Sequence, residues 1–113
     1  MAYVDGFLAP VPTAGKNAYL DFAKKMASKF KEWGAVMIYE CWGDDVPKGD
    51  VTDFARAVAL KDDETVVLSW TVWPDKPTRD AAWAKMMDEA DMEMPFDGKR
   101  MIFGGFDPIH VMN

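Results

Sequence analysis

Apolar side chains recur along the first third of the chain with two different periods, and each period predicts one element. Residues 3–11 are apolar almost throughout and end among prolines, which suit a strand end because proline cannot donate to a ladder. Between residues 15 and 33, large apolar side chains recur every three or four positions with lysines between them, which predicts an amphipathic helix. We expect Thr13 or Asn17 to cap the start of this helix and Gly34 to end it.

The middle of the chain is rich in β-branched and aromatic residues, which favour strands. Residues 35–42 predict a second strand that closes on a turn-forming run of glycine, aspartate and proline. Residues 54–60 alternate larger side chains with alanine, and residues 65–73 form a β-branched and aromatic run. We expect these two segments to pair as a hairpin; a short helix over residues 54–60 is the alternative.

The last part of the chain predicts a second helix and a final strand. Asp75 is placed to cap the helix, with Pro77 in its first turn, where a missing N–H costs little. The expected buried stripe of this helix consists of Trp83, Met86, Met87 and Ala90. Residues 101–111 predict a strand interrupted by Pro108 and by the pair Gly104–Gly105, which indicates a bulge or a close backbone approach.

These elements follow the order β-α-β-(β)-β-α-β within a single domain over residues 1–113. The order is typical of an α+β fold, the ferredoxin-like βαββαβ sandwich, in which two helices cover one face of an antiparallel sheet. Strands with one face in water should alternate apolar and polar residues, but residues 35–42 and 65–73 carry large apolar side chains on both parities. We therefore expect a symmetric homodimer through the sheet face; an unusually apolar exposed face is the alternative.

The charge and the scarce residue types exclude several classes of function. The 113 residues hold 19 acidic and 13 basic side chains, a net charge of -6, which disfavours nucleic acid and anionic membranes as partners. One Cys and one His exclude an internal disulfide, a multi-thiolate zinc site and a multi-His metal centre within one chain. The N-terminal residues lack the basic and apolar regions of a secretion signal, and apolar runs are too short to span a membrane, so we expect a cytoplasmic protein.

Four segments of the chain resemble a known family. Residues 4–7, 40–47, 69–70 and 94–106 closely resemble the YbaA-like bacterial family of unknown function, and the likeness runs over nearly the whole chain. The resemblance implies a ferredoxin-like protomer in the dimeric α+β barrel superfamily. That superfamily includes cofactor-independent monooxygenases, dismutases and small-ligand binders, so the fold alone does not define a function.

Three titratable side chains are candidates for proton transfer. Asp5 and Glu40 lie inside predicted strands among large apolar neighbours, and burial raises a carboxyl pKa toward the range useful for general acid–base catalysis. The alternative is that each is a strand-end charge paired with Arg56 or Arg100. His110 has the ordinary pKa nearest neutrality, but its place close to the C-terminus is also typical of an exposed bystander.

Aromatic residues and one arginine are candidates for a ligand pocket. Trp42, Trp70 and Phe103 offer flat apolar walls, and Arg100 offers a bidentate partner for a ligand carboxylate. We expect a small apolar or aromatic ligand and no metal or organic cofactor. Two classes of function remain open: a cofactor-independent enzyme of monooxygenase or isomerase type, and a non-catalytic ligand-binding or structural dimer.

Overall fold

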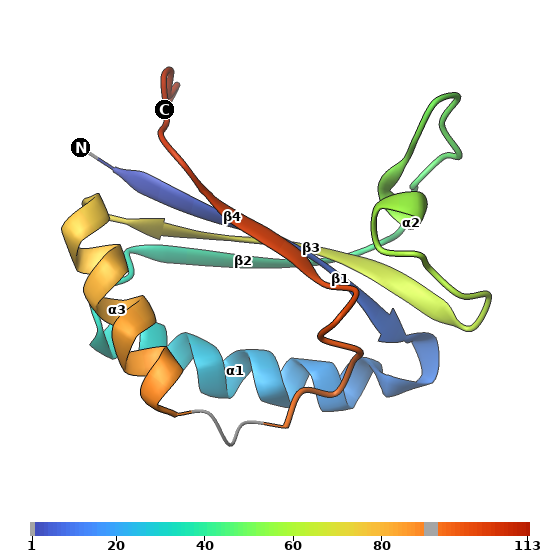
Figure 1. The fold of residues 1–113 in the computed structure, drawn as a ribbon, viewed down its shortest axis with the longest axis horizontal. Coiled ribbons are helices and arrows are strands. Elements are labelled where there is room, and N and C mark those ends of the chain that lie inside the picture. Colours follow the sequence, from blue (N-terminus) through green and yellow to red (C-terminus); the bar gives the residue numbers. More distant parts are fainter. Residues whose placement is uncertain (1, 90–92) are drawn as a thin grey trace.

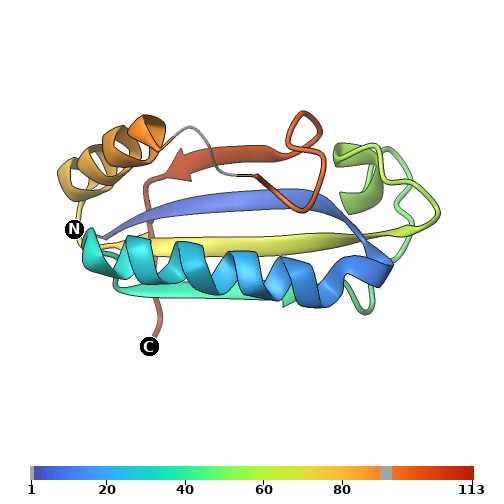
Figure 2. The same cartoon turned by 90° about the horizontal axis from the view of Figure 1, so that it is seen from below.

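The fold is α+β, with a four-stranded antiparallel sheet (Figure 1). The computed structural model describes residues 2–89 and 93–113. In these residues the strands are β1 (Tyr3–Pro12), β2 (Met37–Trp42), β3 (Glu64–Trp73) and β4 (Ile102–Phe106), in the order β2-β3-β1-β4. The helices are α1 (Lys16–Glu32), α2 (Phe54–Ala57) and α3 (Lys76–Asp88), with a 3-10 turn, η1 (Thr13–Gly15), before α1. Helices α1 and α3 lie on the same side of the sheet, and the opposite side, here called the outer face, carries no long helix (Figures 1 and 2).

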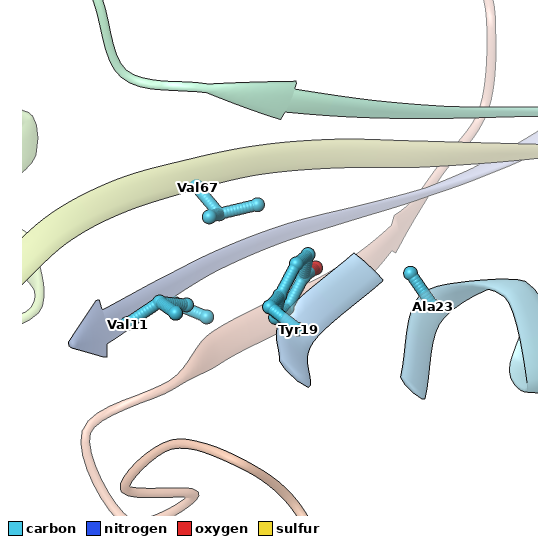
Figure 3. Close-up of a cluster of buried hydrophobic side chains, with 5 residues drawn as sticks. Val11, Tyr19, Ala23 and Val67 are labelled. Carbon is cyan, nitrogen blue, oxygen red and sulfur yellow. The ribbon is translucent and has the colours of Figure 1, made fainter. Parts of the chain in front are cut away.

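The central strand β1 organises the sheet. It pairs along its whole length with β3, from Tyr3 opposite Trp73 to Pro12 opposite Glu64, and its first half also pairs with β4. Because strand side chains alternate between faces, odd-numbered residues of β1 point toward the helices. A buried cluster results between the sheet and α1, formed by Ala9, Val11, Tyr19, Ala23 and Val67, four of which are labelled in Figure 3.

Helix α1 begins differently from the prediction and ends as predicted. Neither Thr13 nor Asn17 caps it, because the chain passes through η1 and the helix starts after Gly15 without a side-chain cap. The Thr13 hydroxyl is instead 2.7 Å from the Thr65 hydroxyl of β3. Gly34 follows the helix with φ of 110°, a left-handed conformation that favours glycine, and an added Cβ would meet Thr78 at 2.7 Å.

The prediction of a strand over residues 54–60 is wrong: α2 occupies this place. Its start is capped by Asp53, whose Oδ1 accepts the Arg56 backbone N–H at 2.7 Å, while Oδ2 accepts the Gly49 N–H at 3.1 Å. The alanines that alternate in this segment are good helix formers and are unsuited to a strand. The aspartate cap therefore decides the local structure against the alternating pattern.

Helix α3 begins as predicted, since Asp75 Oδ1 accepts the Thr78 backbone N–H at 2.8 Å and Pro77 lies in the first turn. Its predicted buried stripe is partly wrong, because Ala82 is buried whereas Met87 is exposed. Trp83 and Met86 are half-buried, and Ala90 lies outside the described residues.

Strand β4 is shorter than the predicted strand and ends at Phe106, two residues before Pro108. It pairs with β1 in an unbroken register, so its glycines serve a close approach rather than a bulge. At Gly105 an added Cβ would lie 2.5 Å from the Tyr3 hydroxyl oxygen and 2.8 Å from Arg79 Nη2. Across residues 2–89 and 93–113, no helix is both long and apolar enough to cross a membrane.

Candidate functional site

A cavity of about 80 Å³ lies on the helix side of the sheet. Its walls come from α1, α3, the inward-facing residues of β1 to β3, and residues 93–101, here called the cover segment. Most of the lining is apolar: Phe7, Ala9, Phe22, Ala23, Met26, Phe30, Met86, Met94, Phe96 and Met101. Polar side chains enter the lining from Tyr19, Glu40, Ser69 and Thr71. The lining has the composition of a ligand site, apolar with a few polar groups, but its volume is below the roughly 300–1,000 Å³ of ordinary ligand pockets.

The polar groups are brought together by the sheet register and by α1. Glu40 and Ser69 are directly opposed partners on β2 and β3, and both point toward α1. Tyr19, one turn into α1, is 7% exposed, and its hydroxyl donates a hydrogen bond of 2.5 Å to Glu40 Oε1. A tyrosine–carboxyl pair therefore forms part of an otherwise apolar wall.

The surroundings shift the titration of both partners. Burial of its carboxyl raises the pKa of Glu40, and the hydrogen bond from Tyr19 partly offsets this rise. Glu40 as a whole stays exposed because β2 is an edge strand, so its carboxyl lies at the border between solvent and the cavity. Burial raises the pKa of Tyr19 as well, with a further contribution from the neighbouring Glu40 carboxyl. Tyr19 therefore stays protonated and acts as a hydrogen-bond donor.

Two residues hold the cover segment against the rest of the protein, Phe96 by packing and Arg100 by hydrogen bonds. Phe96 packs with its ring centroid 5.9 Å from those of Tyr19 and Phe22. Arg100 donates to both carboxylate oxygens of Glu64, at 2.7 and 2.6 Å, and to the Ala59 carbonyl at 2.9 Å. This bidentate pair fixes the cover segment to the start of β3.

We expect the Arg100–Glu64 pair to make the fold sensitive to acid. The Arg100 guanidinium lowers the pKa of Glu64 to about 2 from its ordinary 4.5. A carboxyl whose pKa is lowered on folding stabilises the protein above its unfolded pKa, and this stability is lost as the pH falls from there toward the folded pKa. In urea denaturation at about pH 5 and about pH 3, the wild type should therefore lose more stability than Glu64→Gln. The exposed control Glu32→Gln should follow the wild type; parallel curves for Glu64→Gln and the wild type would contradict the assignment.

Asp5 lies outside the cavity lining and is fully engaged by donors. It is 1% exposed; Oδ2 accepts the Trp73 and Trp83 indole N–H groups at 2.9 Å each, and Oδ1 accepts Arg79 Nη2 at 2.7 Å and Nε at 3.0 Å.

The pairing predicted for Asp5 and Glu40, with Arg56 or Arg100, is therefore wrong: Arg79 takes this place at Asp5, and the Glu40 carboxyl meets Tyr19. The sequence spacing of 74 residues between Asp5 and Arg79 carries no local signal for this contact.

The arginines predicted as partners bind elsewhere. Arg56 Nε lies 3.5 Å from Asp53 Oδ2, and its other guanidinium nitrogens donate to backbone carbonyls of the loop before α2. Arg100 belongs to the Glu64 pair and also donates to Asp97 at 2.9 Å. His110 is exposed in the segment after β4, beyond the end of the sheet.

The predicted pocket residues do not share one cavity. Trp42 is half-buried, with Lys16 Nζ 5.5 Å above its ring. It lines a small hollow beside the cavity and also a groove of about 250 Å³ next to Leu68 on the outer face. Trp70 lies on the outer face and stacks on Tyr39 at 4.7 Å. Phe103 is stacked on Trp83 at 5.3 Å, near the edge of the sheet. In the described residues, no cluster of three or more His, Cys, Asp or Glu side chains is placed to hold a metal ion.

Tyr19, Ser69 and Thr71 are the polar site residues that sequence reasoning missed. The helical period of α1 identifies Tyr19 only as one more member of the apolar stripe. One signal in the sequence could have found them. Alternate residues of a strand share a face, so Glu40 points to the same side of β2 as Ile38 and Trp42. A carboxyl on this covered side has to meet a group on the covering helix.

Comparison with known proteins finds similarity over nearly the whole chain. A model of the family described as "Protein of unknown function (DUF1428)" matches residues 2–104, which include all four strands up to Gly104. The chain is 54% identical over 114 residues to a protein named "Uncharacterized protein YbaA" from Escherichia coli K12, covering 96% of this chain and 97% of that protein. A protein of the same name from Shigella flexneri shows the same identity and coverage.

Proposed function

The chain belongs to the DUF1428 family of proteins of unknown function, and we propose that it binds a small apolar molecule in the cavity between α1 and the sheet. One observation carries this proposal: the cavity is apolar except where the Tyr19–Glu40 pair and two β3 hydroxyls enter it. Apolar walls supply affinity and a few placed polar groups supply orientation. The ligand should therefore be largely apolar and carry one polar group that meets the Glu40 carboxyl or a β3 hydroxyl.

The size of the cavity restricts the ligand. Its volume of about 80 Å³ is smaller than the roughly 150 Å³ engineered cavity that accommodates benzene in another protein. A benzene-sized ligand therefore requires the walls to yield. Four methionines line the cavity, Met26, Met86, Met94 and Met101, and methionine is the apolar side chain that adapts most easily. We place the ligand at about the size of a single substituted ring.

Filling the cavity is expected to weaken this binding. Ala23→Leu introduces three carbon atoms at a buried position of the lining, and Ala18→Leu introduces the same atoms on the exposed side of α1. Binding of 4-methylphenol and toluene is followed by NMR of methionine methyl groups. In the wild type, the methyl signals of the four lining methionines should shift while those of exposed Met37, Met87 and Met112 should not.

We expect Ala23→Leu to weaken binding at least about tenfold, since about 1.4 kcal/mol of lost contact is sufficient. Ala18→Leu should bind as the wild type does. 4-Methylphenol should bind more tightly than toluene, because only the phenol can donate to Glu40. Shifts confined to Met37, Met87 and Met112 would contradict a cavity site.

The architecture of the protomer also forms part of the proposal. The strand order β2-β3-β1-β4, with α1 between β1 and β2 and α3 between β3 and β4, supports a ferredoxin-like sandwich with α2 inserted before β3. We propose that two such protomers pack through their outer faces as a dimeric α+β barrel.

The outer face supports this assembly because it is apolar and because, within residues 2–89 and 93–113, only the short helix α2 borders it (Figure 1). Side chains from all four strands emerge there, among them Met37, Tyr39, Leu68, Ile102 and Phe106, all of them exposed. A groove of about 310 Å³ runs between β4 and α2 over Leu8 and Leu68. An apolar surface of this kind can be covered by an isologous contact, since each copy offers the same groove and the same exposed Phe106 to the other. Light scattering on a sizing column at micromolar concentration tests the assembly, and a monomer would overturn it.

A further inference from the structure

Within residues 2–89 and 93–113, the Glu40 carboxyl differs from the other strand carboxyls, Asp5 and Glu64, because it forms no ion pair with an arginine or lysine. Asp5 and Glu64 each accept from an arginine on both oxygens. The structure records one side-chain hydrogen bond to Glu40, from Tyr19 to Oε1. One side of this carboxyl borders solvent and the other lines an apolar wall, where a charge without a counter-charge reduces stability. A local conflict of this kind is expected at a functional position.

The charged and titratable groups around Glu40 are few. On α1, Tyr19 faces the carboxyl, and Lys16 lines the adjacent small hollow with its ammonium held over Trp42. From β3 come the neutral hydroxyls of Ser69 and Thr71, and from α3 and the cover segment come only methionines and a phenylalanine. In the part of the chain that the structure describes, neither a second acid nor a direct ion pair therefore competes for the proton of this carboxyl.

We propose that Glu40 acts as a proton-transfer base on an apolar carbonyl compound bound in the cavity, with Tyr19 as its positioning residue and Ser69 beside the carbonyl oxygen. This inference rests on the proposed binding function and names its substrate class. The carboxylate removes a proton from the carbon next to the carbonyl, the C–H electron pair forms a C=C bond, and the carbonyl π electrons move to oxygen. Glu40 then returns the proton to oxygen or to carbon. The net change is a tautomerisation, with no oxidant, reductant or second substrate.

Three features of the site fit this step. Ser69 is the ladder partner of Glu40, so a ligand oxygen can reach its hydroxyl while the neighbouring carbon faces the carboxyl. The raised pKa of Glu40 strengthens it as a base near neutral pH. Tyr19 holds one carboxyl oxygen and leaves the other free for the substrate proton.

The experiment measures deuterium uptake at the methyl group next to the carbonyl of acetophenone in heavy water by NMR. The wild type should accelerate exchange over buffer, and Glu40→Gln should lower the protein-dependent rate about 100-fold or more, within the range usual for general acid–base catalysis. Glu32→Gln, an exposed substitution of the same chemistry at the end of α1, should exchange as the wild type does. The rate should rise with pH as Glu40 loses its proton. Tyr19→Phe should move the midpoint of this rise to higher pH, because the Tyr19 hydrogen bond lowers the pKa of Glu40.

Binding of acetophenone is followed in the same samples through the methionine methyl signals. Binding without faster exchange, or equal exchange in Glu40→Gln, would overturn the proton-transfer assignment and leave the binding proposal in place. No binding by the wild type would overturn both. A Tyr19→Phe variant with an unmoved pH midpoint would remove Tyr19 from its positioning role, and this readout does not depend on the folding of Glu40→Gln.

Discussion

Replacing Asp5 with asparagine is expected to lower the free energy of unfolding by about 3–5 kcal/mol, the cost of breaking a buried ion pair at one partner. The carboxylate accepts from two indoles and one guanidinium, and an asparagine offers only one acceptor oxygen to these donors. Its amide nitrogen would face an indole or guanidinium N–H, and Arg79 would lose its buried counter-ion while keeping the surface contact with Asp80.

Urea denaturation and thermal unfolding at neutral pH measure this effect. For a chain of this size the melting temperature should fall by about 10–20 °C. The matched control is Asp80→Asn, which removes a second carboxylate contact of Arg79 at 3.1 Å, but at the surface. Asp80→Asn should leave the transition nearly unchanged. Equal losses in both variants would contradict this prediction. They would show that any carboxylate next to Arg79 contributes as much as the buried Asp5 carboxylate.

Replacing Leu68 with aspartate is expected to weaken the proposed dimer at least about 100-fold, equivalent to roughly 2.8 kcal/mol. Leu68 is on β3 in the middle of the outer face and lines the groove there. Two-fold symmetry would place the new charge in the interface twice, and a central interface residue carries more binding energy than one at the rim.

Sedimentation velocity over a range of protein concentrations measures the dissociation constant. Leu20→Asp is a close control, because Leu20 and Leu68 are both 39% exposed but Leu20 lies on α1, on the helix side of the sheet. Leu20→Asp should stay dimeric where Leu68→Asp is monomeric. A Leu68→Asp protein that remained dimeric would place the interface elsewhere.

Local signals in the sequence account for most of the elements. The three-to-four spacing before Gly34 predicts α1, and the Asp75–Pro77 pair predicts the start of α3, because caps and periods depend on residues close together in the chain. Alternation is a weaker signal when the small residue is alanine, and at residues 54–57 the cap supplied by Asp53 prevails. The predicted boundaries at residues 35 and 111 both extend beyond the observed strands, since ladder pairing ends where the neighbouring strand ends.

The candidate site was only partly accessible from the sequence. Glu40 was recognised because a carboxyl among strand-forming residues is conspicuous. Its partner Tyr19 lies 21 residues away on another element, and only the packing of α1 on β2 and β3 brings the hydroxyl to the carboxyl. The same applies to Asp5, whose donors come from β3 and α3. Contacts between residues so far apart in the sequence depend on how the helices pack on the sheet. The hydrophobic periodicity of a single helix or strand does not determine this packing.

The position of β1 at the centre of the sheet also affects how the chain reaches its native state. β1 is made first, yet its partners are β3, about 50 to 70 residues later, and β4, near the end of the chain. The first 42 residues contain two strands that do not pair with each other. Long loops must therefore close before the central ladder can form, and contacts so distant along a chain slow folding. We expect a nascent chain that has not yet reached Trp73 to expose its first strand unpaired, which makes it a client for chaperones during synthesis.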